Sequence, residues 1–286
     1  MKWLHQRSWS FWRLSVQTAS FALLVSIPLL NFYLKFHFIQ GWYQSISFGD
    51  LWFVSPLEGL ERILVTRDIY GPLLVGMLIP VTLALLCGRV FCGWICPIHY
   101  LSDLSDRLKG IFTRSSKSRD RWLLPRQILW FALIGELLLS LIVGAPIFVF
   151  MSPPGLVGRE MMRLVFFHTL ALEALIVLGV LGMNLITRRF YCRYLCPLGA
   201  LLALLGRKRR LRVVLNPHTC VHCGKCDASC PLGLEPQQGE SEHSHCWNCG
   251  TCIDICPEQS LSYMWHTPLS NHYPIAGSLK DTRGSK

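Results

Sequence analysis

Eight of the 13 cysteines fall into two runs with the same spacing. The first run is CVHCGKCDASCP at residues 220–231, and the second is CWNCGTCIDICP at residues 246–257. Both follow C-x2-C-x2-C-x3-C-P, in which the closely spaced thiolates wrap one [4Fe–4S] cluster and the fourth reaches the other cluster of a pair. The spacing predicts cluster one at Cys220, Cys223, Cys226 and Cys256, and cluster two at Cys246, Cys249, Cys252 and Cys230.

Zinc sites and disulfides are the alternatives for so many thiols. Structural zinc sites use pairs of cysteines or mixed cysteine and histidine sets, not two identical runs of four. Disulfides are rare on the reducing side of a cell membrane, where the basic residues discussed below place these runs. We therefore expect one-electron chemistry, and we interpret His222 and His245 as solvated groups or as partners of ligands.

A second cysteine motif occurs twice, 100 residues apart. The segment RVFCGWICPIHYLSDL at residues 89–104 aligns with RFYCRYLCPLGALLAL at residues 189–204. Cysteines at i and i+4 share one face of a helix. If the copies meet, they form a site for a further cluster, a metal or redox-active thiol pairs, and the alternative is that they are buried packing residues. The four cysteines are Cys92, Cys96, Cys192 and Cys196, whereas Cys87, opposite Thr187, is interpreted as a helix-packing residue.

The elements that must position these motifs are long and apolar. Hydrophobic residues make up 51% of the 286-residue chain, and charged residues only 16%. Four windows have the roughly 20 apolar residues that a membrane-crossing helix needs, namely 14–34, 72–91, 127–149 and 165–187. Because a C-x3-C-P motif follows the second and the fourth window, the spans are predicted to form two parallel repeats.

Basic residues predict which side of the membrane each segment faces. Residues 98–126 and 188–212 are rich in lysine and arginine, whereas residues 35–70 and 150–164 are poor in them. The positive-inside rule then places the N-terminus, the 98–126 loop and the C-terminus in the cytoplasm. The net charge of +11 is thereby explained without a nucleic-acid partner. The aromatic, amphipathic 35–70 segment is expected along the outer membrane interface, and the N-terminal helix is expected to be retained.

Ionisable residues at membrane depth are candidates for a quinone site. Quinol oxidation needs two proton acceptors beside an apolar slot, a task that suits glutamate and histidine. The candidates are His37, His168, Glu136 and Glu173, and the alternative for each is a hydrogen bond within the helix bundle. Arg89 and Arg189 are predicted to extend toward the membrane surface, with cluster tuning as the alternative.

The sequence thus predicts an all-α membrane protein with a small appended redox domain. Residues 1–210 form the four-helix transmembrane domain, and residues 211–265 form an α+β bacterial-ferredoxin-like domain with two [4Fe–4S] clusters. Residues 266–286 are polar and are predicted to be a flexible tail.

Taken together, these motifs resemble the NapH/MauN ferredoxin-type membrane proteins, whose core also occurs in NosR and CcoG-type proteins. The resemblance covers residues 10–260 and rests on R-x-[FY]-C-x3-C-P after two spans, followed by the ferredoxin runs. The chain lacks the flavin-binding region of NosR and the appended domain of CcoG, which favours NapH/MauN. The resemblance carries cluster ligation over to the eight C-terminal cysteines, and the membrane motif to Cys92, Cys96, Cys192 and Cys196.

The resemblance also implies a function. It implies a quinol dehydrogenase subunit in the bacterial inner membrane that takes electrons from menaquinol or ubiquinol. Its expected partners are a periplasmic iron–sulfur protein of the NapG type or a c-type cytochrome. The competing hypotheses are a redox, metal-handling or maturation factor for a metalloenzyme, and a scaffold that docks a periplasmic partner. No Met-rich or His-rich metal-entry motif supports the metal-handling hypothesis.

Overall fold

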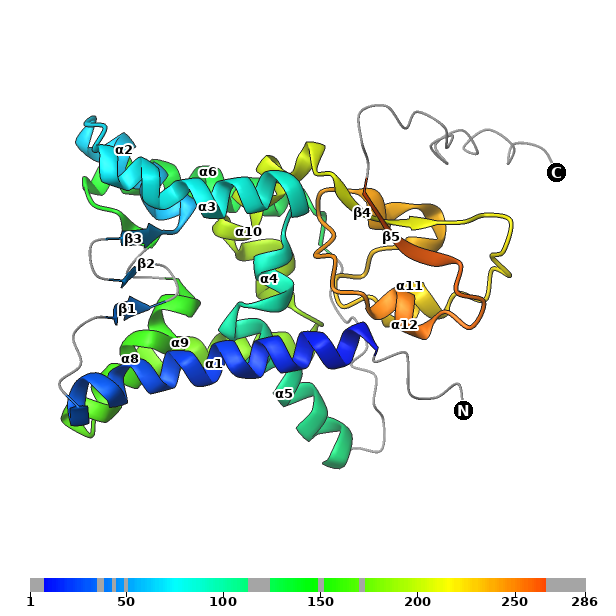
Figure 1. Ribbon diagram of the computed structural model, residues 1–286, viewed down its shortest axis with the longest axis horizontal. Helices are drawn as coiled ribbons and strands as arrows, with labels where there is room; N and C mark the ends of the chain where they lie inside the picture. Colours follow the sequence, from blue (N-terminus) through cyan, green and yellow to red (C-terminus); the bar gives the residue numbers. More distant parts are fainter. Residues whose placement is uncertain are drawn as a thin grey trace.

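The computed structural model describes residues 8–34, 39–42, 45–48, 51–112, 124–148, 152–169 and 173–265. The described part is mostly helical, and Figure 1 shows two groups of helices on either side of a short central pair. One group contains α1 (Trp9–Leu34), α8 (Pro153–Phe167) and α9 (Glu173–Ile186), and the other contains α2 (Pro56–Thr66), α3 (Gly71–Cys87) and α6 (Ile128–Val143). Between them lie α4 (Val90–Trp94) and α10 (Pro197–Leu205), and α5 (Pro97–Phe112) extends away from the centre.

One described helix, Trp9–Tyr33, is long and apolar enough to cross a membrane. Three shorter apolar helices occupy Gly71–Cys87, Ile128–Val143 and Glu173–Asn184. The outward faces of these three are apolar, with large exposed side chains that include Leu78, Phe131, Ile142 and Leu178. Exposed apolar surface on this scale marks an interaction with a partner or with lipid.

The fourth apolar window of the sequence is not one helix. α8 ends at Phe167, and His168 follows it with a left-handed backbone at φ 53°. A new helix, α9, begins at Glu173. The prediction of one span over residues 165–187 is therefore wrong at its start, because the apolar sequence is divided between the end of α8 and a separate helix, a break that composition does not mark.

A small sheet was also missed by the all-α prediction. Strands β1 (Ile39–Trp42), β2 (Ser45–Phe48) and β3 (Leu51–Val54) pair in antiparallel order at the end of the helices opposite the cysteine runs. β3 packs closely on α3, since a Cβ added to Gly76 would lie 2.0 Å from the Trp52 carbonyl oxygen. α2 follows directly, with Pro56 at its first position, where the fixed φ of proline suits a helix start.

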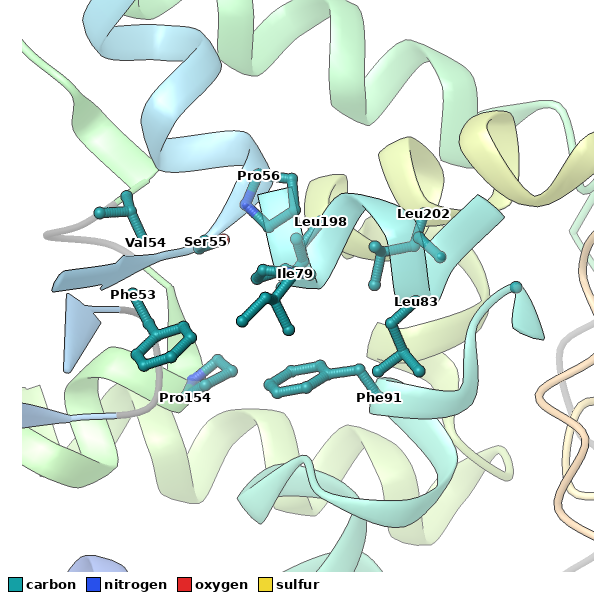
Figure 2. Close-up of a pocket in the computed structure, with 13 residues that line it drawn as sticks. Phe53, Val54, Ser55, Pro56, Ile79, Leu83, Phe91, Pro154, Leu198 and Leu202 are labelled. Atoms are coloured by element: carbon teal, nitrogen blue, oxygen red, sulfur yellow. The ribbon is translucent and has the colours of Figure 1, made fainter. Parts of the chain in front are cut away.

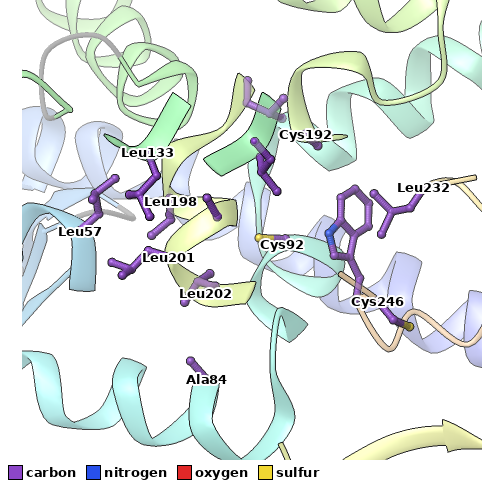
Figure 3. Close-up of a cluster of buried hydrophobic side chains, with 14 of the residues drawn as sticks. Leu57, Ala84, Cys92, Leu133, Cys192, Leu198, Leu201, Leu202, Leu232 and Cys246 are labelled. Atoms are coloured by element: carbon purple, nitrogen blue, oxygen red, sulfur yellow. The ribbon is translucent and has the colours of Figure 1, made fainter. Parts of the chain in front are cut away.

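The core of the molecule surrounds α10. Residues 197–203 are all buried, and their apolar side chains pack with Leu57 of α2, Leu133 of α6 and Cys92 of α4 (Figure 3). The same hydrophobic cluster continues into Trp247 and Cys249 near the far end of the chain. One continuous core therefore joins the apolar helices to the C-terminal cysteine runs.

The C-terminal part is an α+β unit built on one antiparallel strand pair. β4 (Leu211–Leu215) pairs with β5 (Leu261–Trp265), with Leu211 opposite Trp265 and Leu215 opposite Leu261. Two short helices, α11 (Lys225–Ser229) and α12 (Thr251–Ile255), lie within the two cysteine runs and pack on each other. The predicted flexible tail at residues 266–286 lies outside the described residues.

The first turn of α1 is capped by a residue distant in sequence. Asp254 of α12 accepts hydrogen bonds from the backbone N–H groups of Trp9 and Ser10 at 2.9 and 2.7 Å. Both N–H groups belong to the four that a helix start leaves without a partner, and the carboxylate also complements the helix dipole. Trp9 further packs edge-on against Tyr263, with ring centroids 4.7 Å apart. These contacts fix the ferredoxin-like unit to α1.

We expect Asp254→Ala to loosen this attachment. Loss of a helix cap costs about 1 kcal/mol, which corresponds to roughly fivefold faster opening of the first turn of α1. Hydrogen exchange of the peptide covering residues 9–13, measured in detergent, checks this. Asp254→Asn keeps an accepting oxygen and serves as the control, so equal exchange rates in both variants would contradict the capping role.

Candidate redox site

Each set of four cysteines assigned to a cluster lines one cavity. The first cavity is lined by Cys220, Cys223, Cys226 and Cys256, and the second by Cys230, Cys246, Cys249 and Cys252. Each cavity therefore takes three cysteines from one run and the fourth from the other, which is the sharing expected of a two-cluster ferredoxin.

The backbone of the two cysteine loops is alike. His222 and Asn248 occupy the same place in the two runs and have φ values of 52°. Gly224 and Gly250 also match, at φ 67° and 77°. At Gly250 the absence of a Cβ is required twice, because the left-handed backbone favours glycine and an added Cβ would lie 2.4 Å from the Trp9 Cβ.

The four cysteines of the C-x3-C-P copies meet in the core, and we refer to them as the quartet: Cys92, Cys96, Cys192 and Cys196. All belong to or pack against the central hydrophobic cluster. Burial raises the pKa of Cys96 to about 12, and negative charge on Cys92 and Cys196 would raise it further. Burial likewise raises the pKa of Cys196 to about 11. Thiols in such a place ionise only with a compensating cation, and a bound metal deprotonates a coordinating thiol outright.

The two copies hold their second cysteine in the same way. The backbone N–H of Cys96 donates to the Phe91 carbonyl at 3.0 Å, and that of Cys196 donates to the Tyr191 carbonyl at 2.9 Å. Each link spans five residues, as in a π-turn, a feature that is frequent at functional sites. A proline then begins the next helix in both copies, and the Gly199 N–H donates to the Cys196 sulfur at 3.3 Å.

The quartet lies directly against the loop of cluster two. A Cβ added to Gly93 would lie 3.1 Å from the Trp247 Cβ and 3.8 Å from the Cys249 Cβ. The Trp94 indole N–H donates to the Asn248 carbonyl at 2.9 Å. Gly93 and Trp94, which follow Cys92, therefore contact the loop that carries Cys249 of the second cavity.

Buried arginines surround these cysteines. Arg89 is 1% exposed and donates to the Cys192 carbonyl at 3.2 Å and to the His245 carbonyl at 3.4 Å, so it bridges the quartet and the cluster-two loop. Arg209, also 1% exposed, donates to the Cys246 carbonyl at 2.7 Å. Arg189 pairs with Asp103 and Asp106. The prediction that Arg89 and Arg189 extend toward the membrane surface is wrong, because carbonyl and carboxylate partners inside the protein hold them.

This surrounding fits an anionic iron–sulfur cluster. Buried guanidinium groups are costly unless negative charge compensates them, and the Nε atoms of Arg89 and Arg209 have no hydrogen-bond partner. No group of three or more His, Cys, Asp or Glu side chains in the described ranges is arranged to hold a metal ion. A cubane needs a wider arrangement than a single ion does, because each cysteine binds a different iron.

The three predicted quinone residues that the structure describes lie at separate places on or next to α6, α8 and α9. Glu173 pairs with Arg159 at 3.5 Å, His168 is exposed at the end of α8, and Glu136 is half-buried on α6. His37 lies outside the described residues. None of the three described candidates lines the apolar cavity that the structure contains.

That cavity has a volume of about 150 Å³ and reaches from β3 to the start of α4 (Figure 2). Its wall is formed by Phe53, Val54, Ser55, Pro56, Ile79, Pro80, Leu83, Ala84, Gly88, Phe91, Pro154, Leu198 and Leu202. A dry cavity of about this size, lined by Leu, Ile and Phe, holds one aromatic ring. Leu198 and Leu202 of the wall belong to the same hydrophobic cluster as Cys92 and Cys192, and Phe91 packs against it, so the cavity adjoins the quartet.

Comparison with known proteins extends these observations. A family model described as "4Fe-4S binding domain" matches residues 71–115 and again 169–214, and one described as "4Fe-4S dicluster domain" matches residues 212–261. The chain is 30% identical over 232 residues to the methylamine utilization ferredoxin-type protein MauN of Paracoccus denitrificans, covering 80% of this chain and 78% of MauN.

The chain belongs to the NapH/MauN family of ferredoxin-type proteins. It is also 27% identical over 274 residues to the ferredoxin-type protein NapH of Haemophilus influenzae, covering 91% of both chains. No solved structure matches the chain significantly. The chain is therefore an iron–sulfur electron-transfer protein of the NapH/MauN type.

In this NapH/MauN-family chain, sequence reasoning missed a buried acid on α2. Glu61 of α2 is fully buried, and its carboxylate accepts the Phe148 N–H at 3.2 Å. Burial raises the pKa of Glu61 to about 7, and the nearby negative charge of Glu136 adds to the rise. Burial also raises the pKa of Glu58, one turn earlier, to about 7. The sequence signal was S-x-x-E at residues 55–58, which marks a helix start.

We expect Glu61 to make stability pH-dependent. The pKa of Glu61 in the folded chain is raised to about 7, so it keeps its proton up to about that pH, whereas the ordinary pKa of this carboxyl in the unfolded chain is 4.5. The folded state therefore binds more protons, and stability falls as pH rises from about 4.5 to 7. Thermal unfolding in detergent across this range should show a shallower fall for Glu61→Gln than for the wild type. Part of the slope remains in this variant because Glu58 is unchanged. Identical slopes would show that Glu61 is charged in the fold.

Proposed function

We propose that this protein is a membrane quinol dehydrogenase subunit that passes electrons from quinol to iron–sulfur centres. The single observation that carries the proposal is the contiguous order of cavity, quartet and cluster-two loop within one buried core. Quinol releases two electrons and an iron–sulfur cluster accepts one. Two neighbouring acceptors beside an apolar slot are therefore what the reaction requires.

Within this proposal the cysteines act as cluster ligands. Cluster one takes Cys220, Cys223, Cys226 and Cys256, cluster two takes Cys230, Cys246, Cys249 and Cys252, and the quartet holds a third cluster. The clusters supply one-electron storage. Arg89 and Arg209 balance their negative charge from buried positions.

The proposed quinol site is the apolar cavity. Ser55 is the one residue of its wall with a polar side chain, and the Ser55 hydroxyl is buried without a hydrogen-bond partner. A quinol oxygen suits this hydroxyl. Glu58 follows one helical turn later and Glu61 one turn beyond, and acids with pKa values of about 7 are suited to accept protons near neutral pH.

We also propose that four helices span the bacterial inner membrane in two parallel repeats. Support comes from the exposed apolar faces of α3, α6 and α9, and from the family model that matches the chain twice. At about 1.5 Å per residue the 17-residue α3 is about 25 Å long, slightly short of a 30 Å bilayer core, which a locally thinner bilayer accommodates. By the positive-inside rule, the basic segments favour a cytoplasmic location for both termini and for the ferredoxin-like unit.

The proposed periplasmic partner follows from the resemblance to NapH/MauN proteins, whereas the proposed orientation puts the ferredoxin-like unit on the cytoplasmic side. The acceptor would be a periplasmic iron–sulfur protein of the NapG type or a c-type cytochrome, and the quartet and the two cysteine runs would hold the centres that relay electrons toward it. Cys223 is exposed, so cluster one would be the point of contact with a soluble partner.

The purified protein in detergent tests the proposal. Reduced quinone analogue should bleach the cluster absorbance, and oxidised analogue should restore it after chemical reduction. If neither happens while iron and sulfide are present, the quinol dehydrogenase function is wrong. Electron transfer without quinol would then favour a reductase that acts in enzyme maturation.

A further inference from the structure

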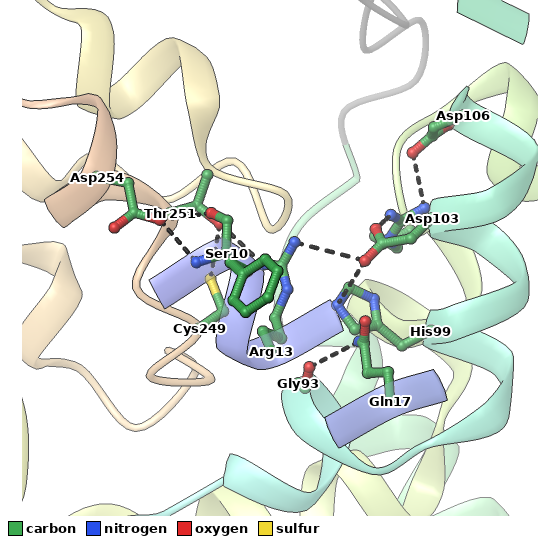
Figure 4. Close-up of polar contacts among 12 residues, drawn as sticks. Ser10, Arg13, Gln17, Gly93, His99, Asp103, Asp106, Cys249, Thr251 and Asp254 are labelled. Atoms are coloured by element: carbon green, nitrogen blue, oxygen red, sulfur yellow. Dashed lines mark hydrogen bonds and ion pairs between the residues drawn. The ribbon is translucent and has the colours of Figure 1, made fainter. Parts of the chain in front are cut away.

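A chain of hydrogen bonds runs from α1 to the sulfur of Cys249. Arg13 of α1 lies between α5 and α12 (Figure 4). Its Nη1 donates to the Thr251 hydroxyl oxygen at 2.8 Å, and its Nη2 lies 3.4 Å from the Asp103 carboxylate. The Thr251 hydroxyl oxygen in turn lies 3.5 Å from the Cys249 sulfur. Residues from three separate segments thus converge beside cluster two.

The direction of these hydrogen bonds follows from their chemistry. A guanidinium only donates, so Thr251 must accept from Arg13. A thiolate bound to a cluster has no proton, so Cys249 must accept from Thr251. The Thr251 hydroxyl proton is thereby directed at the sulfur, and Arg13 strengthens it as a donor by polarising the hydroxyl.

Arg13 is fixed in this position. Its side chain is only 12% exposed, and that of Asp103 only 13%. Asp103 is itself paired with Arg189, next to the quartet in sequence, and Asp254 caps the first turn of α1. The hydrogen bond to the sulfur therefore depends on how α1 is seated against the ferredoxin-like unit.

Cluster one has a different residue at this place. The position that matches Thr251 in the first run is Lys225, which has no hydroxyl. The two runs are otherwise alike in spacing and in loop backbone. The chain therefore carries an internal comparison for the effect of one hydroxyl.

We propose that Thr251, oriented by Arg13, is a positioning residue that raises the reduction potential of cluster two. Reduction adds one negative charge to the cluster, and a donor to its sulfur with a cation behind it stabilises that charge. Cluster two thereby accepts the electron from the quartet more readily than it would without the hydroxyl. The inference rests on the proposed cluster ligation. It adds that α1, through Arg13, influences the reduction potential of cluster two.

The test is a redox titration of the full chain in detergent, followed by electron paramagnetic resonance. In Thr251→Val the equilibrium constant for reducing cluster two should fall about tenfold, which is about 59 mV for a one-electron couple. The potential of cluster one should stay unchanged, and Thr251→Ser should restore that of cluster two. Arg13→Gln, a change outside the cysteine run, should also lower the potential of cluster two. The magnetic coupling to an exchangeable proton near the sulfur should disappear in Thr251→Val.

Separate outcomes would overturn the separate claims. Wild-type potentials in both Thr251→Val and Arg13→Gln would overturn this inference, as would an equal shift of both clusters. If Thr251→Val fails to assemble cluster two, Arg13→Gln alone decides. A wild-type protein with one reducible cluster would overturn the proposed ligation as well. The titration uses a chemical reductant throughout, so the potential of cluster two can be measured even if the protein does not oxidise quinol.

Discussion

Serine in place of Cys192 is expected to stop electron flow from quinol to the ferredoxin-like clusters, with a fall in rate of about 100-fold or more. Cys192 is 7% exposed and lies with the other three quartet cysteines in the core between the cavity and the cluster-two loop. Serine is a poor ligand for iron compared with a thiolate. The iron content should drop from about twelve to about eight atoms per chain, because a cubane holds four.

The matched control is Cys87→Ser. Cys87 is a half-buried free cysteine at the end of α3, outside the quartet, and only its carbonyl has a defined role, as acceptor from Asn248 at 3.0 Å. This variant should keep wild-type iron content and quinol oxidation. If Cys192→Ser also keeps both, the quartet is a packing feature and quinol must reduce cluster two by another route.

The assignment of cysteines to the two cavities could be made from sequence because the spacing between cysteines determines which of them can bind the same cluster. A C-x2-C-x2-C-x3-C run specifies which cysteines surround each cavity, and the cavities are lined as that rule assigned them. The 100-residue repeat likewise identified the four cysteines of the quartet and left open whether they meet. What spacing does not contain is the partner of a side chain far away in sequence, such as the His245 carbonyl for Arg89. From sequence alone, a buried arginine at the end of an apolar segment cannot be distinguished from one that extends to the membrane surface.

The sheet and the cavity were missed for a different reason. Each strand of the sheet has four residues, and β3 is stabilised by close packing on α3 rather than by its own sequence. Gly49 and Asp50 between aromatic segments were the available hairpin signal. Ionisable residues within apolar segments predict a quinone site in the sequence, whereas the cavity wall is almost entirely apolar. Apolar residues that line a cavity have the same sequence pattern as those that fill a core.

Three buried arginines lie close to the cysteines of the redox site. Arg89, Arg189 and Arg209 are each at most 3% exposed, and all three lie beside cysteine-bearing segments. Removing one partner of a buried charge is more costly than never burying it. Arg189 has the carboxylates of Asp103 and Asp106 as partners, whereas Arg89 and Arg209 donate to carbonyl groups. Under the proposed cluster ligation, the chain without clusters should therefore be markedly less stable than the loaded protein, since Arg89 and Arg209 would lose the negative charge that compensates them.

Tryptophan in place of Ile79 is expected to slow quinol oxidation about tenfold while leaving all clusters intact, an effect comparable to other losses of ligand fit in an apolar pocket. Ile79 is 56% exposed on α3 and also lines the cavity, so a larger side chain closes the entrance without disturbing the core. Leu78→Trp is the control, because Leu78 is 63% exposed on the same helix and does not line the cavity. Steady-state oxidation of a quinol analogue, with the iron content measured in parallel, separates the two variants. Equal rates in both would move the quinol site away from this cavity, whereas slowing in Ile79→Trp alone would tie the apolar slot to the electron path through Phe91 and the quartet.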